Sequence, residues 1–209
     1  MNKPKTAPTA LFGSASAARW AGPVILAAFF LCGAVAGCLT AARAAAPADD
    51  ALYAGLRDYL SLLTRPETGR LLGHAFLGAF AYHLAVFFLG LTLFGVAFIP
   101  LTLAARGFFL SFAVTAFARV FGSSGLLLAL GAFGGPTLLT LPCLLALGQA
   151  GLSSSWALLG AARGLSPKPA FTAAYVFRFV LFAAVLALAA LFETFVAPPL
   201  VSWLAGRLI

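Results

Sequence analysis

Residues that could carry chemistry are few in this chain of 209 residues, which has five acidic residues and two histidines. His74 and His83 lie nine positions apart. Side chains on one face of a helix recur at about seven or eleven positions, so these two imidazoles do not indicate a shared site. Ser111 and Thr115 could act as nucleophiles only with a base in reach, and the sequence places none beside them. We therefore expect that the protein is not an enzyme.

The cysteines give no signal for a metal centre. Cys32, Cys38 and Cys143 all fall in apolar segments. Their spacing matches neither a zinc site nor a disulfide framework, and small buried hydrophobic side chains are the simpler interpretation. The sequence thus predicts no catalytic, cofactor-binding or metal-binding residues.

One ionisable side chain stands out because of the apolar sequence around it. The stretch from Ala75 to Ala162 carries only two formal charges, Arg106 and Arg119. A membrane-spanning helix needs ~20 apolar residues, so this stretch has room for three spans. A charged residue within a span is a functional candidate by default. Arg106 is the deep one, and the sequence shows no buried acid to accompany it.

Composition defines the class of protein. The chain is 63% hydrophobic and 9% charged, with a mean hydropathy of +1.06, whereas ordinary globular chains carry about 25% charged residues. We predict an all-α polytopic membrane protein with about five transmembrane helices and an outer amphipathic helix. The net charge of +8 comes from scattered basic residues rather than from a patch with exposed aromatics, so no nucleic-acid partner is expected. The partner that composition requires is the lipid bilayer.

The apolar runs define the domain organisation. Residues 1–19 form a predicted cytoplasmic tail, and residues 20–209 form a single membrane domain. The spans are placed near 21–40, 76–96, 100–121, 125–151 and 175–196, with an outer loop over 41–73. The first span carries Gly33 and Gly37, a small-residue pair that permits close helix approach.

The fate of the first span stays open. We interpret it as retained, since it is long enough to span and further spans follow. Cleavage as a signal peptide is the rival interpretation, because a basic tail precedes the apolar core. Lipidation at Cys38 is another, because residues 35–38 resemble a lipobox.

Glycines and prolines place the turns. A turn at Arg106-Gly107 would leave only about 15 residues before Gly122, too few to span. A turn at Gly95–Pro100 is therefore favoured, with Pro100 at a helix start, where its missing N–H costs nothing, and Arg106 inside the helix. In the fourth span, the run 134–136 and Pro142 indicate either one kinked helix, which we favour, or two half-helices.

The outer loop contains a candidate docking surface. Apolar residues recur there at helical spacing and predict an amphipathic helix at the membrane surface. This helix would either cover the bundle or dock an extracellular partner. The residues that would form its apolar face are Leu52, Leu56, Tyr59, Leu60 and Leu63.

Charge distribution suggests the orientation. With five spans and a cytoplasmic N-terminus, all five acidic residues fall outside, while lysine and arginine divide almost evenly. We predict a multi-pass membrane protein whose N-terminus is cytoplasmic.

The order of glycines, prolines and charged residues along the chain resembles that of a known family. The sequence combines His83, Gly90, Gly95 and Pro100 with an Arg106-Gly107-Phe-Phe run, a broken Gly134-Gly135-Pro136 span and an ending from Phe192-Glu193 to Pro198. This combination resembles the stage II sporulation protein M family. One departure is that Thr137-Leu138 stand where related proteins often have polar residues.

The resemblance implies a function. It implies a scaffold of the bacterial cell (plasma) membrane that acts when the mother cell engulfs the forespore. The scaffold localises two peptidoglycan-degrading partners, stage II sporulation proteins P and D. The candidate in-membrane residues, structural or functional, are Arg106, Gly107, Gly135, Pro136 and Glu193. A permease or channel subunit for a small solute is the alternative. The sequence leaves open whether the chain forms an oligomer.

Overall fold

The protein is a bundle of long helices. The computed structural model describes residues 15–43, 54–55, 57–58, 68–164, 173–196, 198–200 and 203. No strand occurs among these residues. The helices are α1 (Ala15–Ala42), α3 (Thr68–Gly90), α4 (Gly95–Ala129), the π-helical turn η1 (Leu130–Gly134), α5 (Gly135–Ala162) and α6 (Ala173–Phe195).

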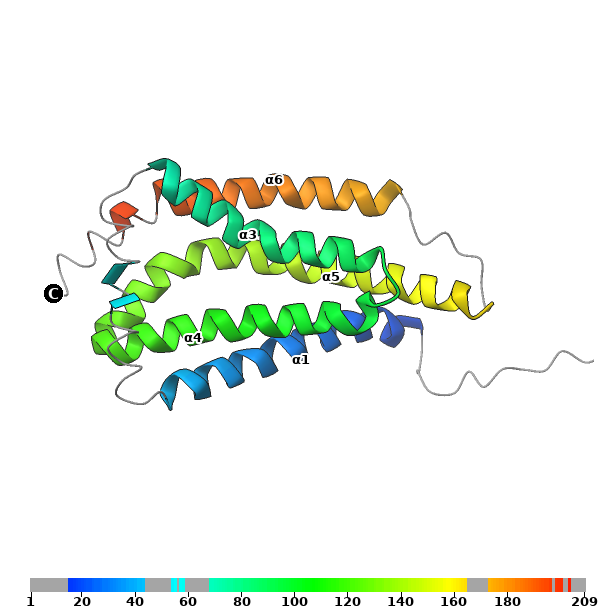
Figure 1. The fold of residues 1–209 in the computed structure, drawn as a ribbon, viewed down its shortest axis with the longest axis horizontal. Coiled ribbons are helices and arrows are strands. Elements are labelled where there is room, and N and C mark those ends of the chain that lie inside the picture. Colours follow the sequence, from blue (N-terminus) through cyan, green and yellow to red (C-terminus); the bar gives the residue numbers. More distant parts are fainter. Residues whose placement is uncertain are drawn as a thin grey trace, which may run out of the picture.

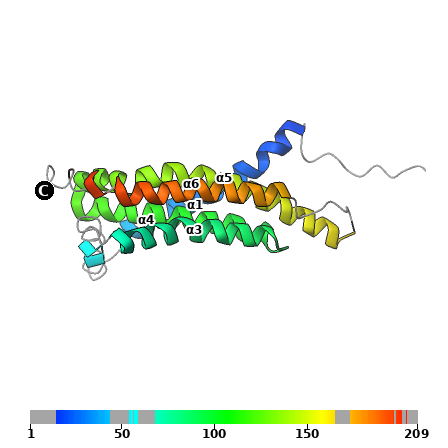
Figure 2. The same ribbon diagram turned by 90° about the horizontal axis from the view of Figure 1, so that it is seen from above.

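The long axes of the helices are roughly aligned, so the bundle has two ends. Figure 1 shows α1 beside α4, and α3 beside α6, with α5 passing between the two pairs. Figure 2 shows the same elongated bundle from above. One end carries the turn between α3 and α4, and we call it the α3–α4 end. The other carries the reversal at Gly122, and we call it the Gly122 end.

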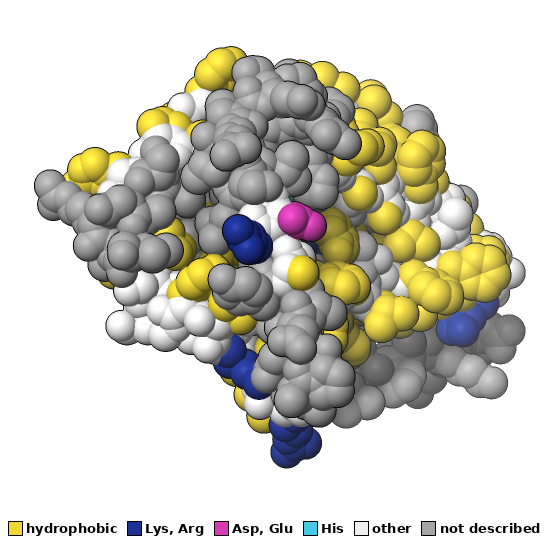
Figure 3. Space-filling model, turned by 60° about the vertical axis from the view of Figure 1, so that its left-hand side comes forward, with side chains coloured by type: hydrophobic (Ala, Val, Ile, Leu, Met, Phe, Trp, Pro, Cys, Tyr) yellow, Lys and Arg dark blue, Asp and Glu magenta, His cyan; other side chains and the backbone are white. Residues whose placement is uncertain are grey.

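The helices are long and apolar enough to cross a membrane. Three such stretches are Ala21–Ala42, Gly95–Ala162 and Tyr175–Leu200. The second has 68 residues and folds back on itself at Gly122, while a shorter apolar segment, Phe80–Gly90, lies in α3. Hydrophobic side chains gather on the lateral surface of the bundle (Figure 3). The chain is an all-α membrane protein.

The first two turns after α3 differ in how well they match expectation. Gly122 has φ 61° within the run assigned to α4, a conformation that glycine adopts readily, and the chain reverses there as predicted. The α3–α4 turn, by contrast, lies before Gly95, so Pro100 sits inside α4 and is buried. The predicted turn at Gly95–Pro100 was therefore placed too late. A Cβ at Gly95 would overlap the Ser155 hydroxyl and the Leu89 carbonyl, so close packing fixes the start of α4 here.

The fourth span is one kinked helix. The π-helical turn η1 leads directly into α5, and Pro136 occupies the first turn of α5. The helix then continues to Ala162, beyond the predicted boundary at 151. The serines beyond residue 151 bond to carbonyl oxygens and do not end the helix. Ser153 donates to Gln149 (2.9 Å), and Ser155 donates to Leu89 of α3 (3.2 Å).

The apolar core is divided. One cluster lies at the Gly122 end and is centred on Phe117 and Leu128. The other lies towards the α3–α4 end and includes Leu103, Leu144 and Leu147. Both clusters join α4 to the fourth span. The stretch between them, around Leu110 and Thr137, belongs to neither cluster.

Candidate functional site

Arg106 lies at a junction of three helices. From α4, its guanidinium carbon stands 5.3 Å from the centre of the Tyr82 ring of α3, a separation at which a cation is attracted to the ring face. It also interacts electrostatically with Glu193 of α6. Both charged side chains are half-buried. The structure thus brings together two residues that the sequence placed in separate spans.

The pairing of Arg106 with Glu193 was missed at the sequence level. The sequence indicated no buried acid near Arg106, because Glu193 appeared to belong to the far end of the fifth span. Within the bundle, α3 packs against both α4 and α6. The long Arg106 side chain of α4 can therefore attract the Glu193 carboxylate of α6. An ionisable pair inside a membrane domain is expected to face the bundle interior and to be mutually compensated.

Two other polar side chains of the bundle are buried. His83, next to Tyr82, is only 2% exposed, and Thr140 of α5 is 4% exposed. His74 lies in α3, but its side chain is outside the described part of the structure. That the two histidines form no shared site stays a prediction.

Gly107 belongs to a second contact, in which α4 packs against α1. A Cβ at Gly107 would overlap the Phe30 carbonyl, and Cβ atoms at Gly33 and Gly37 would overlap the carbonyls of Ala104 and Phe108. Backbone therefore meets backbone along α1 and α4, as small residues permit. We call this contact the α1–α4 seam. It confirms the close-approach face predicted from the first span.

Two hydrogen bonds reinforce the α1–α4 seam. The Ser111 hydroxyl donates to the carbonyl of Ala34, and the Arg119 guanidinium donates to the carbonyl of Ala41 near the end of α1. A cation is favoured at a helix C-terminus because the last carbonyls carry partial negative charge. The Ser111 hydroxyl, a nucleophile by residue type, therefore bonds to a backbone carbonyl in this structure.

Gly135 and Pro136 belong to the contact between α5 and α6. A Cβ at Gly135 would overlap the Phe192 ring, and Pro136 is buried in the first turn of α5. The broken span and the aromatic ending, which are far apart in the sequence, thus pack together. Phe192, which forms this contact, directly precedes Glu193 in α6.

An aromatic joint at the α3–α4 end was not predicted. The Tyr175 hydroxyl of α6 donates to the Phe87 carbonyl of α3 (2.9 Å), and their rings stack with centroids 5.3 Å apart. Gly90 lies against Tyr175 and Gly151, where a Cβ would overlap. Gly90 and Gly151 were the only sequence signal for this joint, and two glycines are a weak signal in a glycine-rich membrane chain.

The remaining candidates give no metal or docking geometry. Cys32 and Cys38 are exposed and Cys143 is buried, all as free thiols. Among the described residues, no group of three or more His, Cys, Asp or Glu side chains could hold a metal ion. The predicted docking residues Leu52, Leu56, Tyr59, Leu60 and Leu63 lie outside the described residues, although Arg57 and Asp58 between them are helical and exposed.

These features define the class of protein as a polytopic helical membrane protein that carries two opposite charges, Arg106 and Glu193, half-buried in its bundle. Comparison with protein families then identifies the family. The model described as stage II sporulation protein M matches residues 26–198, from the first turns of α1 to just beyond α6. The chain therefore belongs to the stage II sporulation protein M family, as its ordered motifs suggested. Searches of curated proteins and of solved structures found no match.

Proposed function

We propose that this protein is a membrane scaffold of the endospore engulfment machinery and is not itself an enzyme. Family membership supports a membrane protein related to sporulation. One observation carries the finer proposal: four polar side chains of the described bundle form hydrogen bonds that join one helix to another. Ser111, Arg119, Ser155 and Tyr175 all donate to backbone carbonyls of neighbouring helices. Such a bundle provides a fixed platform rather than a reactive centre.

The proposed partners are peptidoglycan-degrading proteins, in particular stage II sporulation proteins P and D. The outer loop over 41–73 is the proposed docking segment. It contains four of the five acidic residues and the predicted apolar face. In this arrangement the N-terminus is cytoplasmic, and the loop faces the compartment that contains the peptidoglycan.

A pull-down with loop variants tests the scaffold. The variant Leu56→Asp/Leu60→Asp should lose most capture of either partner, because it places carboxylates in the proposed apolar face. The control is Ala54→Asp, which adds a carboxylate at an exposed helical position of the same segment and should retain capture. Unchanged capture by the double variant would show that the loop is not the docking site.

A small-solute permease or channel subunit is the second candidate, and the Arg106–Glu193 pair favours it. Ionisable groups inside a membrane bundle often mark ion or substrate paths. Purified protein in sealed vesicles should then support solute flux that Arg106→Ala abolishes. Absence of flux for a panel of ions, amino acids and sugars would remove this candidate.

A further inference from the structure

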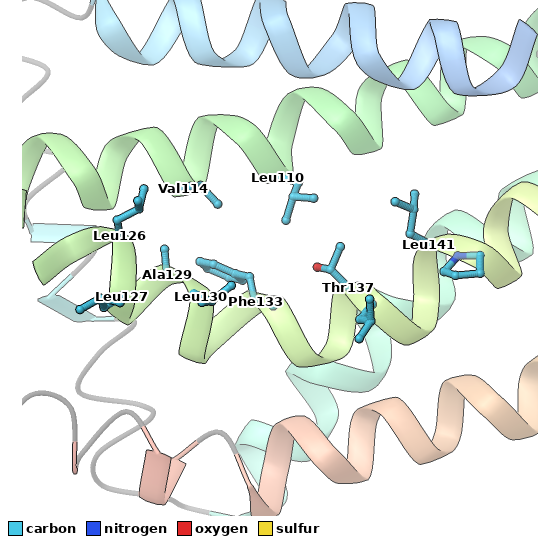
Figure 4. Close-up of a pocket in the computed structure, with 12 residues that line it drawn as sticks. Leu110, Val114, Leu126, Leu127, Ala129, Leu130, Phe133, Thr137 and Leu141 are labelled. Carbon is cyan, nitrogen blue, oxygen red and sulfur yellow. The ribbon is translucent and has the colours of Figure 1, made fainter. Parts of the chain in front are cut away.

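A lateral groove opens between α4 and the kinked fourth span. Its volume is about 450 Å³. Figure 4 shows Leu110 and Val114 of α4 on one wall, with Leu130, Phe133 and Thr137 on the other. We call it the α4–α5 groove. Its lining contains no charged residue.

The groove exists because the fourth span bends away from α4. The π-helical turn η1 widens the helix, and Pro136 and Pro142 each remove a backbone donor within the next two turns. The groove begins beside the cluster around Phe117, which includes Ala129 and against which Val114 and Phe133 pack. Farther along the groove, Leu110 and Thr137 belong to neither core cluster, and the cluster around Leu103 and Leu144 begins after them.

The position of the groove determines what can enter it. Its rim carries exposed leucines: Leu130 is 67% and Leu138 is 77% exposed. These side chains belong to the Gly95–Ala162 stretch, which is apolar enough to lie in the hydrocarbon layer. Protein interiors are close-packed, and unfilled apolar space loses dispersion contacts. The available filler at this depth is uncharged and apolar, which matches the lining.

The shape of the groove distinguishes two apolar occupants, a lipid chain and another helix. It follows the fourth span from Leu126 to Pro142, a length of about 24 Å at helical rise. An α-helix with its side chains is about 10 Å across, and 450 Å³ spread over that length leaves less room than a helix of the same length fills. A hydrocarbon chain therefore fits lengthwise within the groove, whereas a helix could only rest on its rim.

We propose that the α4–α5 groove binds one acyl chain of a bilayer lipid. The chain enters from the Gly122 end, where Ser123 is exposed next to the first lining residues. Its headgroup therefore lies at the level of the Gly122 reversal, and its methylene groups pass Val114, Phe133 and Leu110. The lipid then completes the packing between the two core clusters. This site is independent of the proposed scaffold function.

Photolabelling of the full chain tests this site. The protein is reconstituted in phosphatidylglycerol–phosphatidylethanolamine vesicles doped with a phospholipid that carries a diazirine on one acyl chain, and labelled peptides are mapped. We expect at least fivefold more labelling at groove residues than at Leu188, an exposed residue of α6. Equal labelling at both places would overturn the proposal, because the groove would then be ordinary lipid-facing surface.

Filling the groove supplies the matched comparison. A Cβ at Gly134 would meet only the flexible Leu130 side chain, and nothing lies within 4 Å of a Cβ at Gly160. Gly134→Leu should lower groove labelling at least fivefold, whereas Gly160→Leu, on the same helix, should leave it unchanged. Val114→Phe fills the groove from the other wall and serves if Gly134→Leu does not fold. Unchanged labelling in the folded filled variant would also overturn the proposal.

A crosslinker on the rim distinguishes the helix alternative. A photoreactive amino acid at Leu138, which is exposed on the rim, should react mainly with lipid. Adducts mainly with a second copy of the chain or with another protein would instead make the groove a helix interface and refute the lipid site.

Discussion

α4 packs tightly on one side and loosely on another. Towards α1, Gly33 and Gly107 allow backbone to meet backbone. Towards the fourth span, Leu110 and Val114 face a groove. Both contacts join apolar helices in one bundle, and hydrophobicity does not distinguish them, because lipid tails are as apolar as leucine. The difference shows that residue size and helix continuity decide which helices close together in this protein.

Hydrogen bonding follows the same division. On the α1–α4 seam, Ser111 and Arg119 donate to carbonyls of α1. Along the α4–α5 groove, Thr137 is the only hydroxyl in the lining. The seam therefore fixes the relative position of two helices, whereas the groove leaves space that an exchangeable molecule can occupy.

The largest effect should come from a large side chain in the seam. Gly33→Leu would force a side chain against the Ala104 backbone, which cannot move aside as a flexible side chain can. We expect a loss of about 3 kcal/mol, measured by reversible unfolding in mixed micelles. Gly134→Leu, in the groove, should cost far less. Equal losses in the two variants would mean that seam and groove are packed alike.

The next effect concerns a third side of α4, which carries Arg106. Arg106→Gln or Glu193→Gln alone leaves one charge in the membrane domain without its compensating partner. We expect a loss of about 2 kcal/mol for each, reduced from the value for fully buried pairs because both groups are half-buried. The double variant should lose less than the sum of the two. Strict additivity in this double-mutant cycle would rule out the coupling.

A smaller effect is expected from the seam hydroxyl. Ser111→Ala removes the bond to the Ala34 carbonyl and should cost about 1 kcal/mol in the same unfolding measurement. Ser123→Ala, at an exposed position of the Gly122 reversal, is the matched substitution and should be neutral. A loss in Ser123→Ala as large as that in Ser111→Ala would refute the assignment of the hydroxyl to the seam.

The smallest effect should be at the groove rim. Leu138 is 77% exposed, so Leu138→Ala should change stability by less than about 0.5 kcal/mol. Leu103→Ala, at a fully buried position of the same apolar stretch, should cost about 2 kcal/mol or more. A large loss at Leu138 would indicate that the rim is covered by protein.

Sequence reasoning recovered the features that depend on local composition. Hydropathy identified the long apolar helices, and Gly122 marked a reversal because its positive φ suits glycine. Arg106 was placed inside a helix because a turn there would have left too short a span. The family was recognised from the order of its glycines, prolines and charges.

Features that depend on helix rotation and packing were not recovered. Pro100 looked like a helix start, but contacts of Gly95 with Ser155 and Leu89 set the turn earlier. The fourth span was ended at residue 151, but Ser153 and Ser155 bond to carbonyl oxygens and the helix continues to Ala162. The Arg106–Glu193 pair depends on which faces of α4 and α6 turn inward, and a nearly uniform apolar sequence does not encode that visibly.

The α1–α4 seam also has a consequence for the order of synthesis. Ser111 and Ala34, which it joins, lie 77 positions apart. About 60 residues separate the end of α1 from Ala104, and at ~5–20 residues per second their translation takes roughly 3 to 12 s. During that interval Gly33 and Gly37 of α1 are without the α4 backbone that they contact in the folded bundle. Any other helix with a face of small residues can then compete with α4 for binding to α1. The rate of translation sets how long this competition lasts.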